Sequence, residues 1–227
     1  MKKPKLKKLK EMKIILKEKQ QLFFTSDTHY SHKNICRATT EWTDAEDKTR
    51  DFKSLEYMND RIVYNINSKV GADDILFHLG DWSFGGFEKI DELRDRIVCK
   101  NIHLILGNHD HHIEKDRDGI RSLFSSVNHY LDLEVYDSNF GKFIQNRFIL
   151  MHYPIASWID MNRGTMHLHG HVHLPPQHAV GPGRSMDVGM DGHEMEVVSM
   201  RYIVNRLKMQ PIENLVLPSD HHKKEVR

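Results

Sequence analysis

Short apolar runs recur between residues 22 and 168, and each of them ends in polar residues. Several of these runs carry Phe, Ile, Leu or Val in continuous order instead of alternating with polar residues. Continuous order is typical of strands that are covered on both faces. The pattern predicts five strands, at Leu22–Thr25, Ile75–Leu79, His103–Leu106, Arg147–Met151 and Met166–Leu168.

Apolar residues spaced three or four apart predict helices between these strands. One stripe consists of Phe52, Leu55, Met58, Ile62 and Ile66. A second stripe follows the Gly85–Gly86 break and consists of Phe87, Ile90, Leu93 and Ile97. Strands that alternate with helices predict a layered α/β domain with a largely buried sheet. From about Tyr130 strands predominate, which favours a mixed sheet or a second sheet.

The chain shows no internal repeat and no low-complexity linker, so we expect one domain over residues 21–210. A basic extension over residues 1–20 would precede it, and a polar tail over residues 211–227 would follow it. The 227 residues, 39% apolar and 29% charged, are ordinary for a soluble globular protein. No apolar run approaches the roughly 20 residues of a membrane span.

The two cysteines and the N-terminal segment bear on location. Cys36 and Cys99 form no CxxC pair, so neither a disulfide framework nor a thiolate zinc site is expected. A reducing cytoplasm suits them. The apolar patch Ile14–Leu16 is too short for the core of a secretory signal.

Charge is distributed unevenly along the chain. Residues 1–20 hold nine Lys and two Glu, a net charge of +7, and the other 24 basic and 30 acidic residues give −6. The basic segment could contact nucleic acid or anionic lipid. The alternative, which we favour, is a solvated lysine tail that keeps the protein soluble. A mildly acidic body argues against a nucleic-acid groove over the whole surface.

Polar side chains follow each of the five predicted strands, at the point where the strand ends. In open α/β sheets, ligands bind beyond the carboxyl ends of the strands. The residues at these ends are Asp27 and His29, then Asp81, then Asn108, His109 and Asp110, then His152, and finally His171 and His173.

Each of these residues has an ordinary explanation when taken alone, because Asp-x-His and Gly-Asp are common in turns. Five strand ends that all finish in carboxylate, amide or imidazole groups favour a metal site instead. Nitrogen and oxygen donors without thiolates suit Mn, Fe, Zn, Co or Ni. A structural zinc needs about four ligands. Seven donors suit two ions that share a bridging carboxylate, and the seven counted here are Asp27, His29, Asp81, Asn108, His152, His171 and His173. Two ions about 3.5–4 Å apart can clamp both oxygens of an in-line phosphoryl displacement.

The motifs "DTH", "GDW", "GNHD", "MHYP" and "GHVH" run from Asp27 to His173. In order and approximate spacing they resemble the motifs of the calcineurin-like metallophosphoesterase superfamily. The stretches "FTSDTHYSHKNI" and "FHLGDWSF" look most like its small single-domain branch, of phage and bacterial type. The resemblance implies a four-layer αββα sandwich of two mixed sheets flanked by helices.

The resemblance also implies roles for the residues at the strand ends. One metal ion would be held by Asp27, His29 and His173, the other by Asn108, His152 and His171, and Asp81 would bridge the two. His109 would lie outside the metal shell, where it orients the phosphate or protonates the leaving oxygen, with Asp110 as its partner. Mn is the expected metal, with Fe, Zn, Ni or Co as alternatives.

Other residues near these motifs have weaker signals. His32, Lys33 and Asn34 could meet the substrate phosphate or form a solvated helix start, and Arg163 is a further candidate for anion contact. His78 is interpreted as a structural residue of the core. His167 and His169 are interpreted either as structural residues or as residues that support the metal ligands. Asp187 and Asp191 would either support the metal ligands or form turns.

The expected activity is hydrolysis of nucleotide-type phosphodiesters, cyclic ones included, by a hydroxide held between two metal ions. The protein phosphatases of the superfamily carry an Arg soon after GD and GNHE in place of GNHD, whereas here "WSFGG" follows Asp81. His109 stands where the lipid-precursor pyrophosphatases tend to carry Arg, and a His there suits a poor alkoxide leaving group. The alternatives are a nuclease that processes nucleic-acid ends with help from the basic segment, and a non-catalytic scaffold or nucleic-acid-binding protein.

Overall fold

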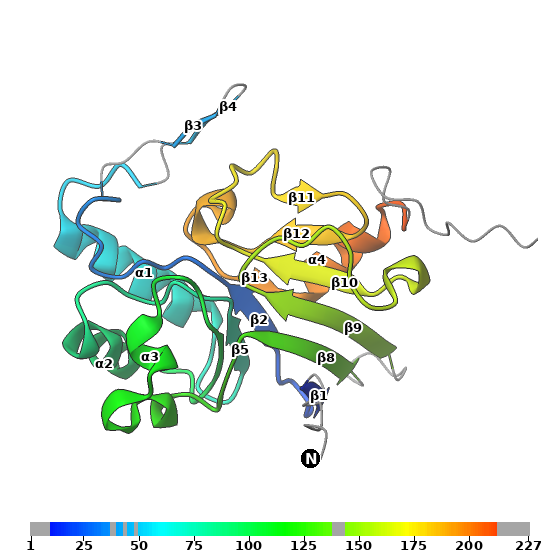
Figure 1. Ribbon diagram of the computed structural model, residues 1–227, viewed down its shortest axis with the longest axis horizontal. Helices are drawn as coiled ribbons and strands as arrows, with labels where there is room; N and C mark the ends of the chain where they lie inside the picture. Colours follow the sequence, from blue (N-terminus) through cyan, green and yellow to red (C-terminus); the bar gives the residue numbers. More distant parts are fainter. Residues whose placement is uncertain (1–9, 37–39, 43–44, 48–49, 138–143, 213–227) are drawn as a thin grey trace, which may run out of the picture.

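The computed structural model describes residues 10–36, 40–42, 45–47, 50–137 and 144–212, which form two mixed β-sheets and the helices around them (Figure 1). The five-stranded sheet has the order β13 (Val198–Ser199), β2 (Leu22–Thr25), β5 (Ile75–His78), β6 (Asn101–Ile105) and β7 (Ser126–Asn128). The six-stranded sheet has the order β1 (Glu11–Ile15), β8 (Tyr130–Asp137), β9 (Ile144–Met151), β10 (Met166–His169), β12 (Ser185–Asp187) and β11 (Val180–Gly181). A separate pair joins β3 (Thr40–Trp42) to β4 (Ala45–Asp47).

Strands β2, β5, β6 and β7 are parallel to one another, and the edge strand β13 runs antiparallel to β2. All residues of β2 and β5 are buried, as their continuous apolar order predicts. Alternate side chains of one strand point to opposite faces. In β5, Leu76 therefore packs in the core beneath the helices, while Ile75 and Phe77 pack in the core between the sheets.

Two helices pack on the face of the five-stranded sheet that points away from the other sheet (Figure 1). Helix α1 (Leu55–Lys69) begins where the Ser54 hydroxyl accepts a hydrogen bond from the Tyr57 N–H, and its stripe Met58, Ile62 and Ile66 is fully buried. Helix α2 (Phe87–Arg96) follows Gly86, whose φ of 80° suits glycine. Both helices lie where the apolar spacing predicts them.

A second core fills the space between the two sheets. The ring of Phe24 lies 5.7 Å from that of Phe77 in its own sheet and 5.4 Å from that of Phe148 in the other sheet. Helix α4 (Met200–Lys208) adds Ile203 and Leu207 to this core. One core thus joins the two sheets.

The remaining elements are short. They are α3 (His111–Glu114), the 3-10 segment η1 (Arg117–Leu123), η2 (Met161–Arg163) and η3 (Met190–His193). Trp158 and Met161, from the segment that contains η2, pack with Ile149 in a small third cluster. Among the described residues, no helix combines the length and the apolar character that a membrane crossing needs.

The predicted N-terminal extension differs from the structure. Residues 11–15 form the edge strand β1, which pairs in parallel with β8, and Leu16 is only 3% exposed. Met12 and Ile14 pack towards the core between the sheets, while Lys13 forms an ion pair with Glu134 at 3.0 Å. The lysine-rich surroundings and the exposed Ile15 obscure this alternation in the sequence. Residues 1–9 and 213–227, the rest of the predicted extension and most of the predicted tail, lie outside the described residues.

Neighbouring substitutions distinguish an integral strand from a solvated tail. We predict that Leu16→Ala lowers the free energy of unfolding by about 2–5 kcal/mol, as expected for a buried leucine. Ile15→Ala, at a side chain that is 67% exposed, should change it by less than about 0.5 kcal/mol. Urea denaturation of both variants checks the prediction, and equally small effects at the two positions would contradict it.

Candidate metal centre

The segments that follow five strands meet at one end of the two sheets. The carboxyl ends of β2, β5 and β6 lie at the same edge because these strands are parallel, and β9 and β10 end together for the same reason. Backbone hydrogen bonds join the segments, from Asp27 N to Gly80 O at 2.9 Å and from Gly170 N to His152 O at 2.9 Å. The sheets are joined by the His171 N–H, which donates to the Asp27 carboxylate at 2.9 Å.

Six of the seven predicted ligands form two groups that could hold a metal ion, one of Asp27, His29 and His173 and one of Asp81, His152 and His171. The seventh, Asn108, lies beside the second group, with its side-chain oxygen 3.1 Å from His152 Nε2. In the first group, Nε2 of His29 lies 3.1 Å from Nε2 of His173, and Asp27 Oδ1 lies 3.8 Å from each. Donors around one ion at about 2.1 Å lie about 3.0–3.5 Å apart, so the groups have nearly the spacing of ligand shells.

Asp81 lies between the two groups. Its Oδ2 is 3.5 Å from His29 Nε2 and 3.5 Å from His152 Nε2. Its Oδ1 accepts a hydrogen bond from the His109 backbone N–H at 2.9 Å. One oxygen of the carboxylate is thus held by the backbone, while the other is equidistant from one imidazole of each group. This is the arrangement that a bridging ligand requires.

Asp27 supplies a test of whether the residues fit a metal ion. Its side chain is fully buried, and Oδ1 has no hydrogen-bond partner, whereas Oδ2 accepts from His171 N–H. A buried carboxylate oxygen without a partner is costly. A cation among Asp27, His29 and His173 would remove that cost, so the donor set and its orphaned oxygen fit a divalent ion.

Five of the seven predicted ligands have a left-handed backbone, with φ of 54° at Asp27, 44° at His29, 56° at Asp81, 72° at His171 and 53° at His173. Non-glycine residues rarely adopt this conformation, which costs about 1–2 kcal/mol per residue. Such strain clusters at functional sites because the surrounding structure must hold it in place. Here it turns each side chain sharply at the end of its strand.

Two glycines permit the close approach of these segments. A Cβ at Gly107 would lie 2.2 Å from Asp81 Oδ1, and a Cβ at Gly170 would lie 2.0 Å from Ser26 Oγ and 2.2 Å from Asp27 Oδ2. Any larger residue would displace a predicted ligand. The glycines of "GNHD" and "GHVH" are therefore part of the site.

The structure contradicts the expected pairing of Asp110 with His109. Asp110 is 3% exposed, and its carboxylate accepts hydrogen bonds from the backbone N–H groups of Gly107, Asp81 and Trp82 at 2.8–2.9 Å. These three bonds come from backbone groups of the turns after β5 and β6, and none of them comes from the His109 ring. Asp110 therefore positions Asp81, because it ties the turn after β5 to the turn after β6.

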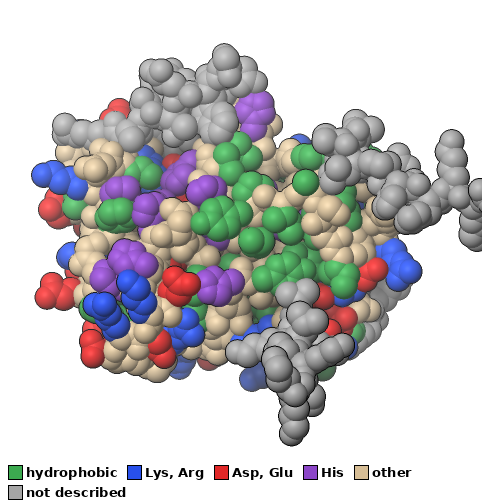
Figure 2. All heavy atoms as spheres, in the orientation of Figure 1, with side chains coloured by type: hydrophobic (Ala, Val, Ile, Leu, Met, Phe, Trp, Pro, Cys, Tyr) green, Lys and Arg blue, Asp and Glu red, His purple; other side chains and the backbone are tan. Residues whose placement is uncertain are grey.

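His109 and His32 lie on the open side of the site. The His109 ring is 5.4 Å from that of His29, 5.0 Å from that of Phe84 and 6.3 Å from that of His32. His32 and Phe84 stack in parallel at 3.8 Å. On the face seen in Figure 2, several histidine side chains gather closely. Asn34 is exposed two residues beyond His32. The sequence motifs did not predict that Phe84 of "WSFGG" contacts the rings of His32 and His109.

The prediction for Arg163 is wrong. Strands β9 and β10 are parallel, so the chain crosses to the far end of the sheet before β10 begins. Arg163 lies at that end, in η2, where it forms an ion pair with Asp160 and is 84% exposed. The four residues of β10 span about 13 Å, which separates Arg163 from His171. An anion contact at the metal centre is excluded by this topology.

Two of the four imidazole ligands are oriented by contacts at their second ring nitrogen. Nδ1 of His152 donates to Leu79 O at 2.7 Å, which leaves Nε2 free to face Asp81. Nδ1 of His173 lies 2.5 Å from a carboxylate oxygen of Asp191. Asp187 accepts from Gly189 N–H at 2.7 Å, as a turn residue does, and from Leu174 N–H, next to His173, at 3.3 Å.

Three other histidines are structural, as predicted. His78 is fully buried, accepts from Gly80 N–H and bonds the Thr28 hydroxyl at 2.9 Å. His167 bonds Ile149 O through Nδ1 at 3.0 Å and accepts from Ile155 N–H at 3.3 Å, and His169 is buried beside Gly170 O. Burial lowers the pKa of His78 to about 3 and the pKa values of His167 and His169 to about 4.

The candidate ligands have perturbed acidities. Burial raises the pKa of Asp27 to about 6, although the charges of His173 and His152 act to lower it. Burial also opposes ionisation of Asp81, but the hydrogen bond and charge of His152 hold its pKa below the ordinary value. Burial would lower the pKa of His152, yet Asp81 and Asp27 together raise it to about 9. Without a cation, these carboxylates therefore favour a proton on His152.

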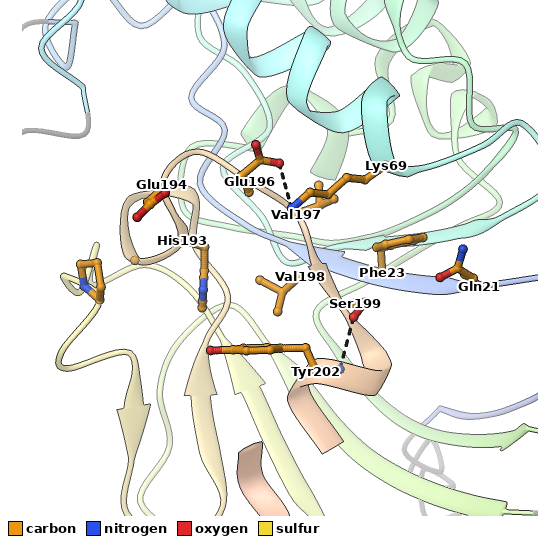
Figure 3. A pocket seen from close by; sticks show the side chains of 12 residues that line it. Gln21, Phe23, Lys69, His193, Glu194, Glu196, Val197, Val198, Ser199 and Tyr202 are labelled. Atoms are coloured by element: carbon orange, nitrogen blue, oxygen red, sulfur yellow. Dashed lines mark hydrogen bonds and ion pairs between the residues drawn. The ribbon is translucent and has the colours of Figure 1, made fainter. Parts of the chain in front are cut away.

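A groove of about 670 Å³ lies apart from this centre, between the end of α1, the segment after η3 and the start of α4 (Figure 3). Phe23, Val198 and Tyr202 line it, and Lys69 pairs with Glu196 across it at 3.1 Å. None of the seven predicted ligands lines this groove. This groove is therefore separate from the candidate metal centre.

Comparisons with known proteins define the fold class and leave the family open. No family model matches the chain, and no curated protein matches it. The fold is similar to the crystal structure of a protein of unknown function from Aquifex aeolicus, with a TM-score of 0.56 and 20% sequence identity. The match covers 82% of this chain and 99% of that one. At this identity the likeness supports the mixed α/β class and says nothing of activity.

Metal binding should depend on pH because His152 must lose its proton to coordinate an ion. Its pKa of about 9 means that the metal-free protein carries this proton at neutral pH, so the ion must displace it. We predict that the apparent affinity for Mn²⁺ rises about tenfold per pH unit, for each proton displaced, from about pH 6 to about pH 8. Calorimetry in buffers of different ionisation enthalpy measures the protons released. The exposed control His129→Asn should keep this dependence, and a pH-independent affinity would contradict the prediction.

Proposed function

We propose that the protein is a phosphodiesterase that uses two divalent transition-metal ions to hydrolyse nucleotide-type phosphodiesters. The observation that carries the proposal is the position of Asp81 Oδ2, 3.5 Å from an imidazole nitrogen of each group. A structural site for one ion has no need of a carboxylate shared between two sets of donors. Two adjacent ions are typical of enzymes that transfer phosphoryl groups.

Further support comes from the fold and the donor set. The two packed mixed sheets, with α1 and α2 on the outer face of one of them, supply three of the four layers of the αββα sandwich of the calcineurin-like metallophosphoesterases. We propose membership of that superfamily. Donors that are carboxylate, amide and imidazole favour Mn²⁺, with Fe, Zn, Ni or Co as alternatives. The free thiols of Cys36 and Cys99 suit a reducing cytoplasm.

Each residue has a defined task in the proposed reaction. Asp27, His29 and His173 would hold one ion, and Asn108, His152 and His171 would hold the other, with Asp81 shared between them. When bound, the pair of ions supplies Lewis acidity towards the phosphate and an activated water. Asp110 keeps Asp81 in place through the backbone of both turns.

His109 is the candidate acid for the leaving oxygen. Its backbone N–H is bonded to Asp81 at 2.9 Å, which fixes the residue beside the shared carboxylate. Its ring faces those of His29, His32 and Phe84, so the imidazole lies next to the phosphate position without belonging to either donor group. An imidazole can protonate an alkoxide as it leaves. A diester with a poor leaving group benefits most from such a proton.

The proposal predicts diesterase activity that depends on Asp81. Metal-stripped protein resupplied with Mn²⁺ should hydrolyse bis(p-nitrophenyl) phosphate. Asp81→Asn should lower kcat/KM by more than about 100-fold, because even the partners of metal ligands affect activity by about 10–100-fold. Asp91→Asn, an exposed substitution on α2, should leave turnover unchanged. Cleavage of p-nitrophenyl phosphate alone, with no diester turned over, would overturn the proposal.

A second prediction concerns the acid. His109→Ala should lower kcat/KM by about 100-fold on a diester with an alkyl leaving group, within the range that acid–base catalysis supplies. On a p-nitrophenyl diester the loss should be less than about tenfold, because that group leaves without a proton. His111→Ala, an exposed histidine two residues away, serves as the control. Equal losses on both substrates would remove His109 from the role of acid.

A further inference from the structure

Arg50 is a buried cation behind the first donor group, and no sequence motif points to it. It is 2% exposed and precedes helix α1. Its guanidinium donates to both oxygens of Asp191, from Nε at 2.6 Å and from Nη2 at 3.0 Å. It also donates from Nη2 to the backbone oxygen of Asp27 at 2.5 Å and from Nη1 to that of Thr28 at 3.3 Å.

These contacts reach two of the three donors of one group. Asp191, itself 2% exposed, lies 2.5 Å from Nδ1 of His173 and so orients the ring whose Nε2 faces His29. The bond to the Asp27 backbone holds a residue whose left-handed φ of 54° needs support. A single guanidinium thereby braces Asp27 directly and His173 through Asp191.

The second donor group is braced by other contacts. His152 is oriented by Leu79 O at 2.7 Å, and Asp81 is held by the Asp110 carboxylate and the His109 backbone. Within the described part of the chain, the hydrogen bonds of Arg50 reach Asp27, Thr28 and Asp191 and none of the residues of this group. The two halves of the centre therefore have different buried supports, although the bond from His171 N–H to Asp27 links them.

Fold stability is a weak reason to bury this cation. The desolvation of a buried ion pair offsets much of its attraction, and apolar side chains of similar volume often stabilise a fold equally well. An arginine that spans a carboxylate and two backbone oxygens with a planar fork supplies orientation instead. Partners that orient a metal-bound imidazole commonly control metal affinity.

We propose that Arg50 is a positioning residue for one half of the metal centre, where it sets the affinity for the ion held by Asp27, His29 and His173. This proposal rests on the proposed dinuclear site. It predicts that the loss of Arg50 weakens one ion and leaves the other, at Asn108, His152 and His171, unaffected. A purely structural arginine would show no such selectivity.

The test measures metal binding directly on the full chain. Mn²⁺ is titrated into metal-free wild-type protein and into Arg50→Met, Arg50→Lys and Asp191→Asn, with calorimetry and electron paramagnetic resonance as readouts. Wild type should bind two ions with the spectrum of a coupled pair. In Arg50→Met, one dissociation constant should rise about 10–100-fold, and the spectrum at one equivalent should be that of a single uncoupled ion. Arg50→Lys keeps the charge and loses the planar fork, so its dissociation constant for this ion should lie between those of wild type and Arg50→Met.

Arg147→Met is the matched control. Arg147 makes a comparable bidentate contact with Asp132, at 2.8 and 2.6 Å, and bonds Asp160 at 2.5 Å, at the far end of the six-stranded sheet. The substitution Arg147→Met should lower the melting temperature and leave the affinities for both metal ions unchanged. If Arg50→Met does not fold, Asp191→Asn decides, since it keeps the volume of the side chain and weakens the same link to His173.

Two outcomes would overturn the proposal. Either both ions bind all the Arg50 and Asp191 variants as tightly as wild type, or both affinities fall together in proportion to the melting temperature. Failure of the proposed function is separable, because a wild type that binds two ions and shows one weakened site in Arg50→Met, yet hydrolyses no diester, would refute the activity alone. A wild type that binds fewer than two ions would refute both.

Discussion

The organisation of this protein depends on one carboxylate, that of Asp81, being held between two sets of imidazoles. Its two oxygens have different tasks, since Oδ1 is fixed by the His109 backbone and Oδ2 lies 3.5 Å from His29 and His152 alike. Such a position requires a left-handed residue at the end of β5 and a glycine at 107 that leaves room for the carboxylate. It also requires the buried Asp110 to tie the neighbouring turns together. The local backbone is therefore built around this group at a cost in strain that the two packed cores must offset.

The two sheets explain how distant parts of the chain reach this carboxylate. Parallel order aligns the carboxyl ends of β2, β5 and β6 in one sheet and of β9 and β10 in the other. The core between the sheets, with Phe24, Phe77 and Phe148 at its centre, brings the two edges together. Hydrogen bonds such as that from His171 N–H to Asp27 then fix the edges at atomic distance. Rigid strands thus position the donors, which suits a site whose ligands must keep their spacing in the absence of an ion.

Much of this architecture could be predicted from the sequence because local patterns encode it. Continuous apolar runs marked the buried strands, and apolar spacing marked α1 and α2. The polar residues after each strand identified the seven donors that the structure brings together in and beside the two groups. The failures concern contacts that depend on topology. The crossover before β10 places Arg163 at the end of the sheet opposite the metal centre. Asp110 accepts hydrogen bonds from backbone groups, one of them Trp82 N–H in the turn after β5. Arg50 contacts Asp191, which is distant in the sequence, and has no local signature. Strand β1 escaped notice because its short apolar alternation lies in a lysine-rich segment and an exposed isoleucine, Ile15, obscures it.

The central claim, that Asp81 is shared by two metal ions, is tested most directly by crystals of the full chain grown with Mn²⁺. Anomalous diffraction measured on either side of the manganese absorption edge would locate each ion independently of any activity. The account predicts two peaks about 3.5–4 Å apart, one beside Asp27, His29 and His173 and one beside Asn108, His152 and His171, with the Asp81 carboxylate in contact with both. A single peak, or two peaks of which only one contacts Asp81, would contradict it.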